Sequence, residues 1–400
     1  MVTALMVGGL LAAACESTEP DPVQPERPAW HRVTLPAPAG EPGRLMLRDI
    51  THCADRWYLV GAVADPGGAT RPAAWTSTDG QQWTSLTFLA DSYYGRQNVV
   101  YSAACRDGRL AALGAKTGGA HAYPRTSSWW QRPDGALVEV AARFELFGGP
   151  TAVNVGRLVG GSPGWLIVGN RSAGAAAWVS PDAAEFELLE GAPELASDDR
   201  GVTWAFDAVA RSGGATVGGA PAGWLMVGGV LTPGRIDRDP LVWTSLDGRT
   251  WQRVPVPATR EYEELQRVVL VGATPVAVGL RGRVLGSWRG GEGGAGGWTA
   301  GGEFGAVGGT GVVPGVSGLT VAGERLLTTV SDGIGYGIWT SPDLGDAWRP
   351  VTAPAPMPAG PDRDAGLLAA GDRLVLFIDA GADGGDASEG SGLWWTEFRL

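Results

Sequence analysis

Tryptophan recurs along this chain in a regular pattern. Seven short apolar segments carry a Trp at intervals of 45 to 65 residues, namely Trp75, Trp129, Trp178, Trp243, Trp288, Trp339 and Trp394. In four repeats a second Trp follows eight to ten residues later, as Trp83, Trp251, Trp298 and Trp348, and Leu137 and Phe186 take that place in the second and third repeats. Internal similarity at a period of about 50 residues indicates an array of repeated units.

Each repeat reads as four short β-strands. The first is an apolar stretch such as residues 99–105, the second a GWLIVG-type run (residues 164–169), and the third and fourth contain the two Trp positions. Alternating apolar residues, β-branched and aromatic residues, and Gly-rich gaps are typical of strands and turns. The 64 Gly and 28 Pro residues among 400 argue against a helical protein. We therefore predict an all-β protein, a seven-bladed β-propeller with four-stranded blades.

The two ends of the chain predict how the ring closes. The seventh repeat ends at residues 392–400 without a fourth strand. WHRVTLP at residues 30–36 is similar to the fourth-strand sequences WQRVPVP (residues 251–257) and WRPVTAP (residues 348–354). We expect this N-terminal strand to complete the last blade, so that residues 30–400 form one domain without an open sheet edge.

Polar turns separate the third and fourth strands. STDGQQW, SLDGRTW and SPDLGDAW begin at Ser77, Ser245 and Ser341, and weaker forms contain Asp134 and Asp182. Asp followed by Gly suits a tight hairpin, because Gly accepts positive φ and Asp can accept hydrogen bonds from nearby amides. The residues assigned to these hairpins are Ser77, Asp79, Trp83, Ser245, Asp247, Trp251, Ser341, Asp343, Gly345 and Trp348. Equivalent copies around a ring cannot all serve one active site, so we interpret them as structural.

These turns resemble the Asp boxes of sialidase-like, BNR-repeat β-propellers. The resemblance extends over residues 30–400 and implies boxes on the face of the ring away from the substrate. It also implies a catalytic set of three Arg, a Tyr–Glu pair and an acid Asp. The Arg-Ile-Pro motif that usually holds the first of these Arg residues does not occur in the chain, so no catalytic role is carried over to any residue.

The N-terminal residues resemble the export signal of bacterial lipoproteins. An apolar run at residues 2–14 ends at Cys15, although no Lys or Arg precedes it. The resemblance implies a signal peptide over residues 1–14 and lipidation of Cys15, and hence a protein anchored to the cell membrane on its extracytoplasmic side. A buried core segment is the alternative. Residues 15–29 are acidic and Pro-rich, which predicts an unpacked tether.

One face of the ring is the expected binding surface. In a propeller, the connections between blades and between second and third strands share a face, and loops often carry function. Arg and aromatic side chains there suit a sugar, a peptide or an anionic group. The candidates are Tyr93, Tyr94, Arg96, His121, Tyr123, Arg125, Arg235, Asp237, Arg238, Asp239, Arg260, Tyr262, Glu263 and Glu264. For each loop, ordinary solvated residues are the alternative. Tyr262 and Glu263 are a weak nucleophile pair, since adjacent strand residues point to opposite faces.

Cysteine and histidine content limits the other sites. Cys53 and Cys105 occupy matching positions in the first two repeats, and we predict a disulfide between adjacent blades. The chain has three His without clustered Cys, so no metal site is expected. The acidic loop at residues 379–390 could hold Ca²⁺ through Asp379, Asp383 and Asp386, but its spacing does not match an EF-hand and we prefer a mobile loop. No cofactor is expected.

Charge narrows the function. The net charge is −11 and Lys116 is the single Lys, which argues against nucleic-acid binding. Two classes remain. We favour a non-catalytic binding or scaffold module for a glycan, a peptide or an envelope protein, acting as a monomer that meets the membrane only through its lipid. The alternative is a glycan-acting hydrolase with a rearranged site.

Overall fold

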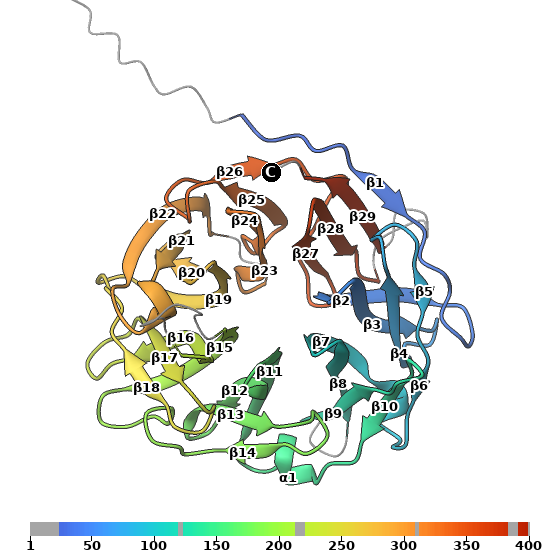
Figure 1. Cartoon of the computed structure of the whole chain (residues 1–400), viewed down its shortest axis with the longest axis horizontal. Helices are drawn as coiled ribbons and strands as arrows, with labels where there is room; N and C mark the ends of the chain where they lie inside the picture. Colours follow the sequence, from blue (N-terminus) through green and yellow to red (C-terminus); the bar gives the residue numbers. More distant parts are fainter. Residues whose placement is uncertain (1–23, 119–122, 213–220, 309–311, 383–390, 399–400) are drawn as a thin grey trace, which may run out of the picture.

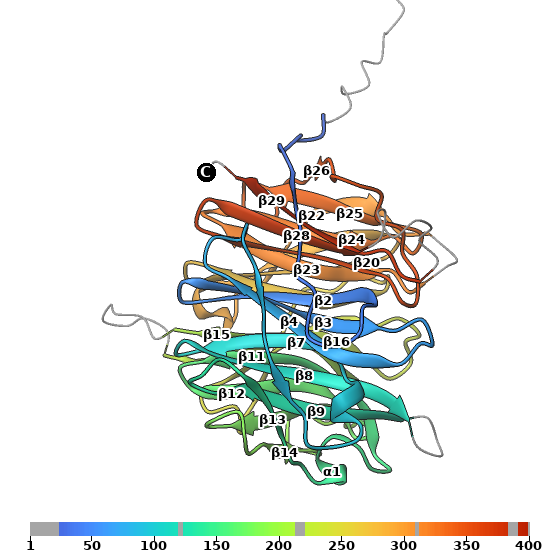
Figure 2. The same cartoon turned by 90° about the vertical axis from the view of Figure 1, so that its right-hand side faces the viewer.

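Seven antiparallel sheets surround a central axis, one sheet per sequence repeat (Figure 1). The structure is a computed structural model and describes residues 24–118, 123–212, 221–308, 312–382 and 391–398. Seen from the edge, the strands run between two opposite faces of the ring (Figure 2). The predicted seven-bladed β-propeller is confirmed. Among the described residues, no helix is long and apolar enough to span a membrane.

The first four blades follow the order of the sequence. Blade 1 comprises β2 (Arg44–Cys53), β3 (Arg56–Ala64), β4 (Thr70–Ser77) and β5 (Thr84–Ser85). Blade 2 comprises β7 (Val99–Arg106), β8 (Arg109–Gly118), β9 (Tyr123–Gln131), β10 (Leu137–Val140) and β6 (Phe88–Leu89). Blade 3 comprises β11 (Ala152–Gly161), β12 (Gly164–Arg171), β13 (Gly174–Ser180) and β14 (Glu187–Leu189). Blade 4 comprises β15 (Val202–Arg211), β16 (Gly223–Leu231), β17 (Asp239–Ser245) and β18 (Gln252–Val254).

The last three blades complete the ring. Blade 5 comprises β19 (Glu263–Val271), β20 (Thr274–Arg281), β21 (Val284–Arg289) and β22 (Thr299–Ala306). Blade 6 comprises β23 (Gly315–Ala322), β24 (Arg325–Ser331), β25 (Tyr336–Ser341) and β26 (Arg349–Val351). Blade 7 comprises β27 (Asp364–Ala370), β28 (Arg373–Asp379), β29 (Gly392–Glu397) and β1 (His31–Val33). The short helices are η1 (Gly95–Gln97), α1 (Phe144–Phe147) and η2 (Glu292–Gly294).

Blade 2 departs from the expected four strands. The short strand β6 pairs in parallel with the outer edge of β10, where Phe88 lies opposite Leu137. This fifth strand comes from the connection that leaves blade 1, so it covers an edge that would otherwise expose unpaired backbone groups.

The N-terminal segment closes the ring as predicted. Strand β1 pairs antiparallel with β29, with His31 opposite Trp395 and Val33 opposite Leu393. The chain also packs further upstream than expected. Within the predicted tether, Glu26 donates its amide to the Pro350 carbonyl at 2.9 Å, and its carboxylate lies 3.2 Å from the guanidinium of Arg325. Residue 26 is therefore attached to blade 6.

The repeated Trp residues form the cores between blades. Trp75, Trp178 and Trp243 in the third strands are completely buried. Their indole N–H groups donate to backbone carbonyls of the segment entering the same blade, at 2.8, 2.6 and 2.8 Å. A buried indole thus both fills the space between two sheets and satisfies its own donor, as large aromatic residues with a polar atom require.

In blades 1, 4 and 5 the Gly at the end of the GWLIVG-type run has a steric cause. A Cβ added to Gly61, Gly228 or Gly279 would collide with the backbone carbonyl of the paired inner strand. In each case the inner strand has a register shift beside this point, which brings its backbone unusually close. The recurring Gly therefore makes room for a bulge in the neighbouring strand.

Candidate functional site

The hairpins between third and fourth strands build one hydrogen-bonded turn. In blade 1, Ser77 Oγ donates to Asp79 Oδ1 at 2.9 Å and accepts from the Gly80 amide at 2.9 Å. Asp79 Oδ1 also accepts from two following amides at 2.8 Å each, and Trp83 Nε1 donates to the Gly80 carbonyl at 3.0 Å. Burial opposes ionisation of Asp79, but these amide hydrogen bonds outweigh it and lower its pKa. Every polar atom named here serves the turn itself.

The same turn occurs in blades 3, 4 and 6. The Ser two residues earlier donates to Asp182 at 3.0 Å, to Asp247 at 3.1 Å and to Asp343 at 2.8 Å. In blade 6 the additional residue, Leu344, also has left-handed backbone (φ 58°) and precedes Gly345 (φ 96°), whereas the shorter turns of blades 1 and 4 have positive φ at Gly80 and Gly248. Asp134 of blade 2 differs, because it accepts from a single described amide, that of Ala136 at 3.1 Å, and its other oxygen pairs with Arg132 at 3.1 Å. Blade 2 thus lacks the turn that blade 3 retains.

The inner strands place a polar ring around the axis. Register shifts in six inner strands are each followed by one residue of this ring, in order Asp49, Ser102, Arg157, Asp207, Arg267 and Gly318. The side chains of Asp49, Ser102 and Asp207 accept a backbone amide from the next blade at 2.9, 3.0 and 3.1 Å. These bonds connect neighbouring blades close to the axis.

Charges within this ring compensate one another. The Arg157 guanidinium lies 3.4 Å from Asp49 and 3.4 Å from Asp207, and Asp49 in particular raises its pKa. Burial, with a further contribution from Arg157, lowers the pKa of Arg267 to about 10. A cavity of about 320 Å³ lies among these side chains. Asp364, where β27 begins, has a pKa raised to about 7, chiefly by burial.

Two of the candidate loops meet between blades 4 and 5. Tyr262 Oη donates to Glu264 Oε2 at 2.5 Å, and the Arg238 guanidinium donates to the same oxygen at 2.8 Å while lying 5.2 Å from the Trp204 ring centre. Glu263 points elsewhere and pairs with Arg281 at 3.1 Å. The adjacent Tyr262 and Glu263 thus form no pair. Burial, with the nearby Glu264 carboxylate, raises the pKa of Tyr262, which keeps the phenol protonated.

The remaining residues of these loops make mostly local contacts. Arg235 pairs with Asp239 at 3.1 Å and donates to the Thr259 carbonyl at 3.1 Å. Within the described residues, the side chains of Asp237 and Arg260 have no hydrogen-bond or ion-pair partner. The loop of blade 4 is therefore held against the loop that enters blade 5.

A second pair of candidate loops meets over blade 2. The Arg125 guanidinium lies 4.1 Å from the Phe144 ring centre and 5.6 Å from that of Tyr94. Its Nε is buried without a hydrogen-bond partner, and it forms no ion pair within the described residues. Tyr93 is 65% exposed and packs edge-to-face on Tyr94, and Arg96 donates to the Asp91 carbonyl at 3.0 Å. His121 lies outside the described residues, and Tyr123 begins β9.

Two adjoining cavities, which we call the blade-2 groove, lie beside this cation, and Arg125 lines the first of them. The cavities measure about 280 and 210 Å³ and share Pro124, Thr126, Phe144, Phe147 and Gly148. Glu139 lines the groove, but its carboxylate already accepts from two amides and from the hydroxyls of Ser92 and Ser127. Burial opposes the ionisation of Glu139, yet these bonds lower its pKa, so it is a satisfied anion and no counter-ion for Arg125. Sequence reasoning missed Phe144 and Phe147, whose only signal is a short FELF segment.

Cysteine and acidic candidates fall in three places. The structure joins Cys53 and Cys105 by a disulfide between blades 1 and 2, with Cα atoms 5.3 Å apart. Asp379 is buried and paired with Arg44 at 3.1 Å and with Arg48, so its carboxylate is occupied by arginine. Asp383, Asp386 and Cys15 lie outside the described residues. Within those residues, no group of three His, Cys, Asp or Glu could hold a metal ion.

Comparisons with known proteins found similarity only at the level of structure. No family model matches the chain, and no curated protein matches its sequence. The β-propeller domain of the Trilobed protease from Pyrococcus furiosus is similar, with a TM-score of 0.49 and 9% identity over 88% of this chain and 93% of that one. Pyrococcus horikoshii acylaminoacyl peptidase is similar with a TM-score of 0.49 and 9% identity. The match covers 89% of this chain and 53% of that chain. Trypanosoma rangeli sialidase is similar with a TM-score of 0.41 and 12% identity, and the match covers 92% of this chain and 60% of that one. No residue role is taken from these likenesses, and the resemblance to Asp-box propellers remains a prediction.

Proposed function

We propose that this protein is a non-catalytic binding module, and that it recognises a carboxylate-bearing segment of another molecule in the blade-2 groove. The single observation that carries the proposal is the Arg125 cation, whose side chain has no hydrogen-bond or ion-pair partner among the residues that the structure describes. It lies 4.1 Å from the Phe144 ring centre and 5.6 Å from that of Tyr94, and the Glu139 carboxylate that lines the same cavity is already satisfied. An Arg held by stacking keeps its planar donors for a carboxylate, which it can bind in bidentate fashion.

The shape of the groove suits an apolar group next to that carboxylate. The second cavity is lined mainly by apolar or small residues, among them Tyr101, Ala115, Phe147 and Ala152. Pockets that combine an apolar wall with a few polar groups are the usual form of a specific binding site. A peptide C-terminus with an apolar last side chain would place its carboxylate at Arg125 and its side chain in the second cavity.

The charges near the axis support the non-catalytic assignment. Arg157 lies between Asp49 and Asp207, and Asp379 is held by two Arg. These carboxylates are engaged with neighbouring cations and amides, whereas a glycoside hydrolase needs a pair of carboxyl groups directed at a sugar. The ring therefore resembles a structural connection between blades more than a reacting centre.

A peptide array with free and amidated C-termini tests the proposal. We expect binding of peptides with a free carboxylate and an apolar last residue, loss of binding in Arg125→Ala, and retention in Arg96→Ala, an exposed Arg of the same face. Equal binding of free and amidated peptides, or unchanged binding by Arg125→Ala, would contradict it. The predicted anchor is tested separately, since Cys15→Ala should release the protein from membranes.

One observation favours hydrolase activity as a second candidate. Tyr262, Glu264 and Arg238 are in direct contact, with Tyr262 Oη 2.5 Å from the Glu264 carboxylate. The raised pKa of Tyr262 disfavours the phenolate that a nucleophile would need. Aryl glycosides of several sugars provide the assay. Turnover by the wild type that is lost in Tyr262→Phe would establish this second function.

A further inference from the structure

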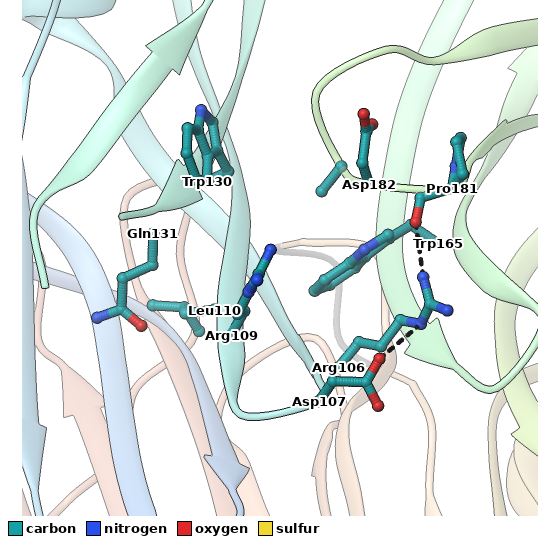
Figure 3. Close-up of a pocket in the computed structure, with 10 residues that line it drawn as sticks. Arg106, Asp107, Arg109, Leu110, Trp130, Gln131, Trp165, Pro181 and Asp182 are labelled. Carbon is teal, nitrogen blue, oxygen red and sulfur yellow. Dashed lines mark hydrogen bonds and ion pairs between the residues drawn. The ribbon is translucent and has the colours of Figure 1, made fainter. Parts of the chain in front are cut away.

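A slot opens on the opposite face, between blades 2 and 3. It measures about 290 Å³ and lies on the face that carries the hairpins. Trp130 stands on one side, Asp182 and Pro181 on the other, and Arg109 projects between them beside the buried Trp165 (Figure 3). Below the slot, Arg106 donates to the Pro181 carbonyl at 2.6 Å and pairs with Asp107 at 3.3 Å.

The equivalent slot between blades 7 and 1 is filled by the protein itself. Arg373 and Trp395 occupy the same strand positions there as Arg109 and Trp130, because in both blades the Trp lies opposite the residue two places after the Arg. The Arg373 guanidinium lies 4.7 Å from the Trp395 ring centre and donates to the Asp79 carbonyl of the next blade. Between blades 2 and 3, the residue that donates to the hairpin of the next blade is Arg106, which bonds to the Pro181 carbonyl. Arg109 makes no such contact among the described residues.

Trp130 is not needed by the blade architecture. The same position is occupied by Thr76, Thr244 and Thr340 in blades 1, 4 and 6, and all three are buried. In blade 2 a large aromatic ring stands there and remains partly exposed. A partly exposed indole in a cavity offers a flat apolar surface on which a ligand can stack.

The polar groups beside this ring are available and balanced in charge. Within the described residues, the Arg109 side chain has no hydrogen-bond or ion-pair partner. Asp182 uses Oδ1 for its own turn, and none of the described donors bonds to Oδ2. A ligand there meets one cation and one anion on opposite sides, so neither an acidic nor a basic ligand is favoured by charge.

We propose that this slot binds a neutral saccharide, with one sugar ring stacked on Trp130 and its hydroxyls bonded to Arg109 and Asp182. A pyranose has an apolar face for the indole and a polar rim for a donor and an acceptor. A neighbouring cavity of about 480 Å³ between blades 1 and 2 also contains Arg109 and Gln131, which gives room for a second sugar unit. The site lies on the face opposite the blade-2 groove and is independent of the proposed function.

An array of neutral and acidic oligosaccharides, followed by calorimetric titration of the best ligand, tests this site. Trp130→Thr is the central variant, because Thr fills this position in three other blades and the fold should survive; Arg109→Ala removes the exposed donor. We expect binding of neutral glycans and about a tenfold or larger loss of affinity in both variants, as for a central aromatic contact. Arg125→Ala, in the groove on the other face, should bind like the wild type.

Three outcomes would overturn the proposal. They are no bound glycan on the array, binding restricted to acidic glycans, or wild-type affinity in Trp130→Thr. Because Arg125→Ala is measured against the same ligand, failure at this slot is distinguishable from failure of the groove, which the peptide array reports.

Discussion

Asp364 carries a charge that the fold opposes, and its replacement by Asn should stabilise the protein above neutral pH. The residue begins β27 beside the axis, and burial raises its pKa to about 7 against the attraction of Arg48 and a hydrogen bond from the Ala365 amide at 2.8 Å. Asp49 repels the carboxylate from β2, while Arg267 attracts it from β19. On balance the folded protein prefers the neutral acid.

The size and sign follow from proton linkage. The unfolded chain ionises Asp364 near pH 3.8 and the folded protein near pH 7, so the folded state binds the proton more tightly between these values. The stability of the wild type therefore falls by this contribution as the pH rises from about 4 to 7. At 1.36 kcal/mol per pH unit the loss is at most about 4 kcal/mol, and about 2 to 4 kcal/mol is expected because the carboxyl group is only partly shielded from solvent.

Urea unfolding at pH 4, 6 and 8, followed by tryptophan fluorescence, measures the effect. Asn resembles the protonated acid at every pH, so Asp364→Asn should match the wild type at pH 4 and exceed it by about 2 to 4 kcal/mol at pH 8. Asp379→Asn is the matched control on the paired strand position. It removes the partner of two Arg side chains and should cost about 3 to 5 kcal/mol at pH 8.

The difference in free energy of unfolding between the wild type and Asp364→Asn shows whether the Asp364 carboxylate destabilises the fold. If Asp364→Asn were no more stable at pH 8 than at pH 4 relative to the wild type, the carboxylate would not be destabilised by its surroundings. If the variant were less stable at pH 8, Arg48 and Arg267 would outweigh burial, and the ring would depend on Asp364 as a counter-ion.

Three further changes test the fold. Cys53→Ser should lower the free energy of unfolding by about 4 kcal/mol, because the disulfide closes a loop with a sequence separation of 52 and so restricts the unfolded chain. Urea unfolding without reductant measures this loss, and an unchanged unfolding curve would contradict a stabilising role of the disulfide. Asp247→Ala should lower the free energy of unfolding by about 1 to 2 kcal/mol. It should also speed hydrogen exchange of the amides at residues 249 and 250, which donate to Asp247 at 2.8 Å, and exchange as slow as in the wild type would argue against the turn. Gly228→Ala should cost about 3 kcal/mol or more in the same urea assay, because the new methyl group meets the Trp204 carbonyl; full stability would mean that the β15 bulge can move.

The repeat made most of the fold predictable. A Trp recurs in the third strand of all seven blades, where the indole packs between sheets, and a Gly recurs in the second strand of blades 1 to 5, so a shared physical requirement leaves the same residue at equivalent positions. The pairing of β1 with β29 was predictable for the same reason, since a fourth-strand sequence stood at the wrong end of the chain. Strand β6 could not be predicted from the repeat, because this two-residue strand pairs with the edge of blade 2 and has no counterpart in the other blades.

The candidate sites were less predictable because they depend on contacts between repeats. Tyr262 binds Glu264 and not Glu263, since residues two apart on a strand share a face, yet only the structure shows Arg238 of the preceding blade completing the cluster. Arg125 and Tyr94 come from different loops, and α1 supplies the second ring. The composition of the loops was enough to select these residues as candidates, but which of them lie close together depends on which blades are neighbours.

Departures from the repeat are concentrated in blade 2. It has a fifth strand and a following helix, it lacks the hydrogen-bonded turn of blades 1, 3, 4 and 6, and it carries Trp130 where three blades have Thr. In a ring whose blades meet equivalent neighbours, packing alone would favour equivalent solutions in each. Arg125 on one face and Arg109 on the other are not solutions to packing, because neither side chain has a hydrogen-bond or ion-pair partner among the described residues and each lies near an aromatic surface. Blade 2 is therefore where binding should be sought, and replacing Trp130 by the Thr that blades 1, 4 and 6 have at this position tests binding without removing a residue that the fold requires.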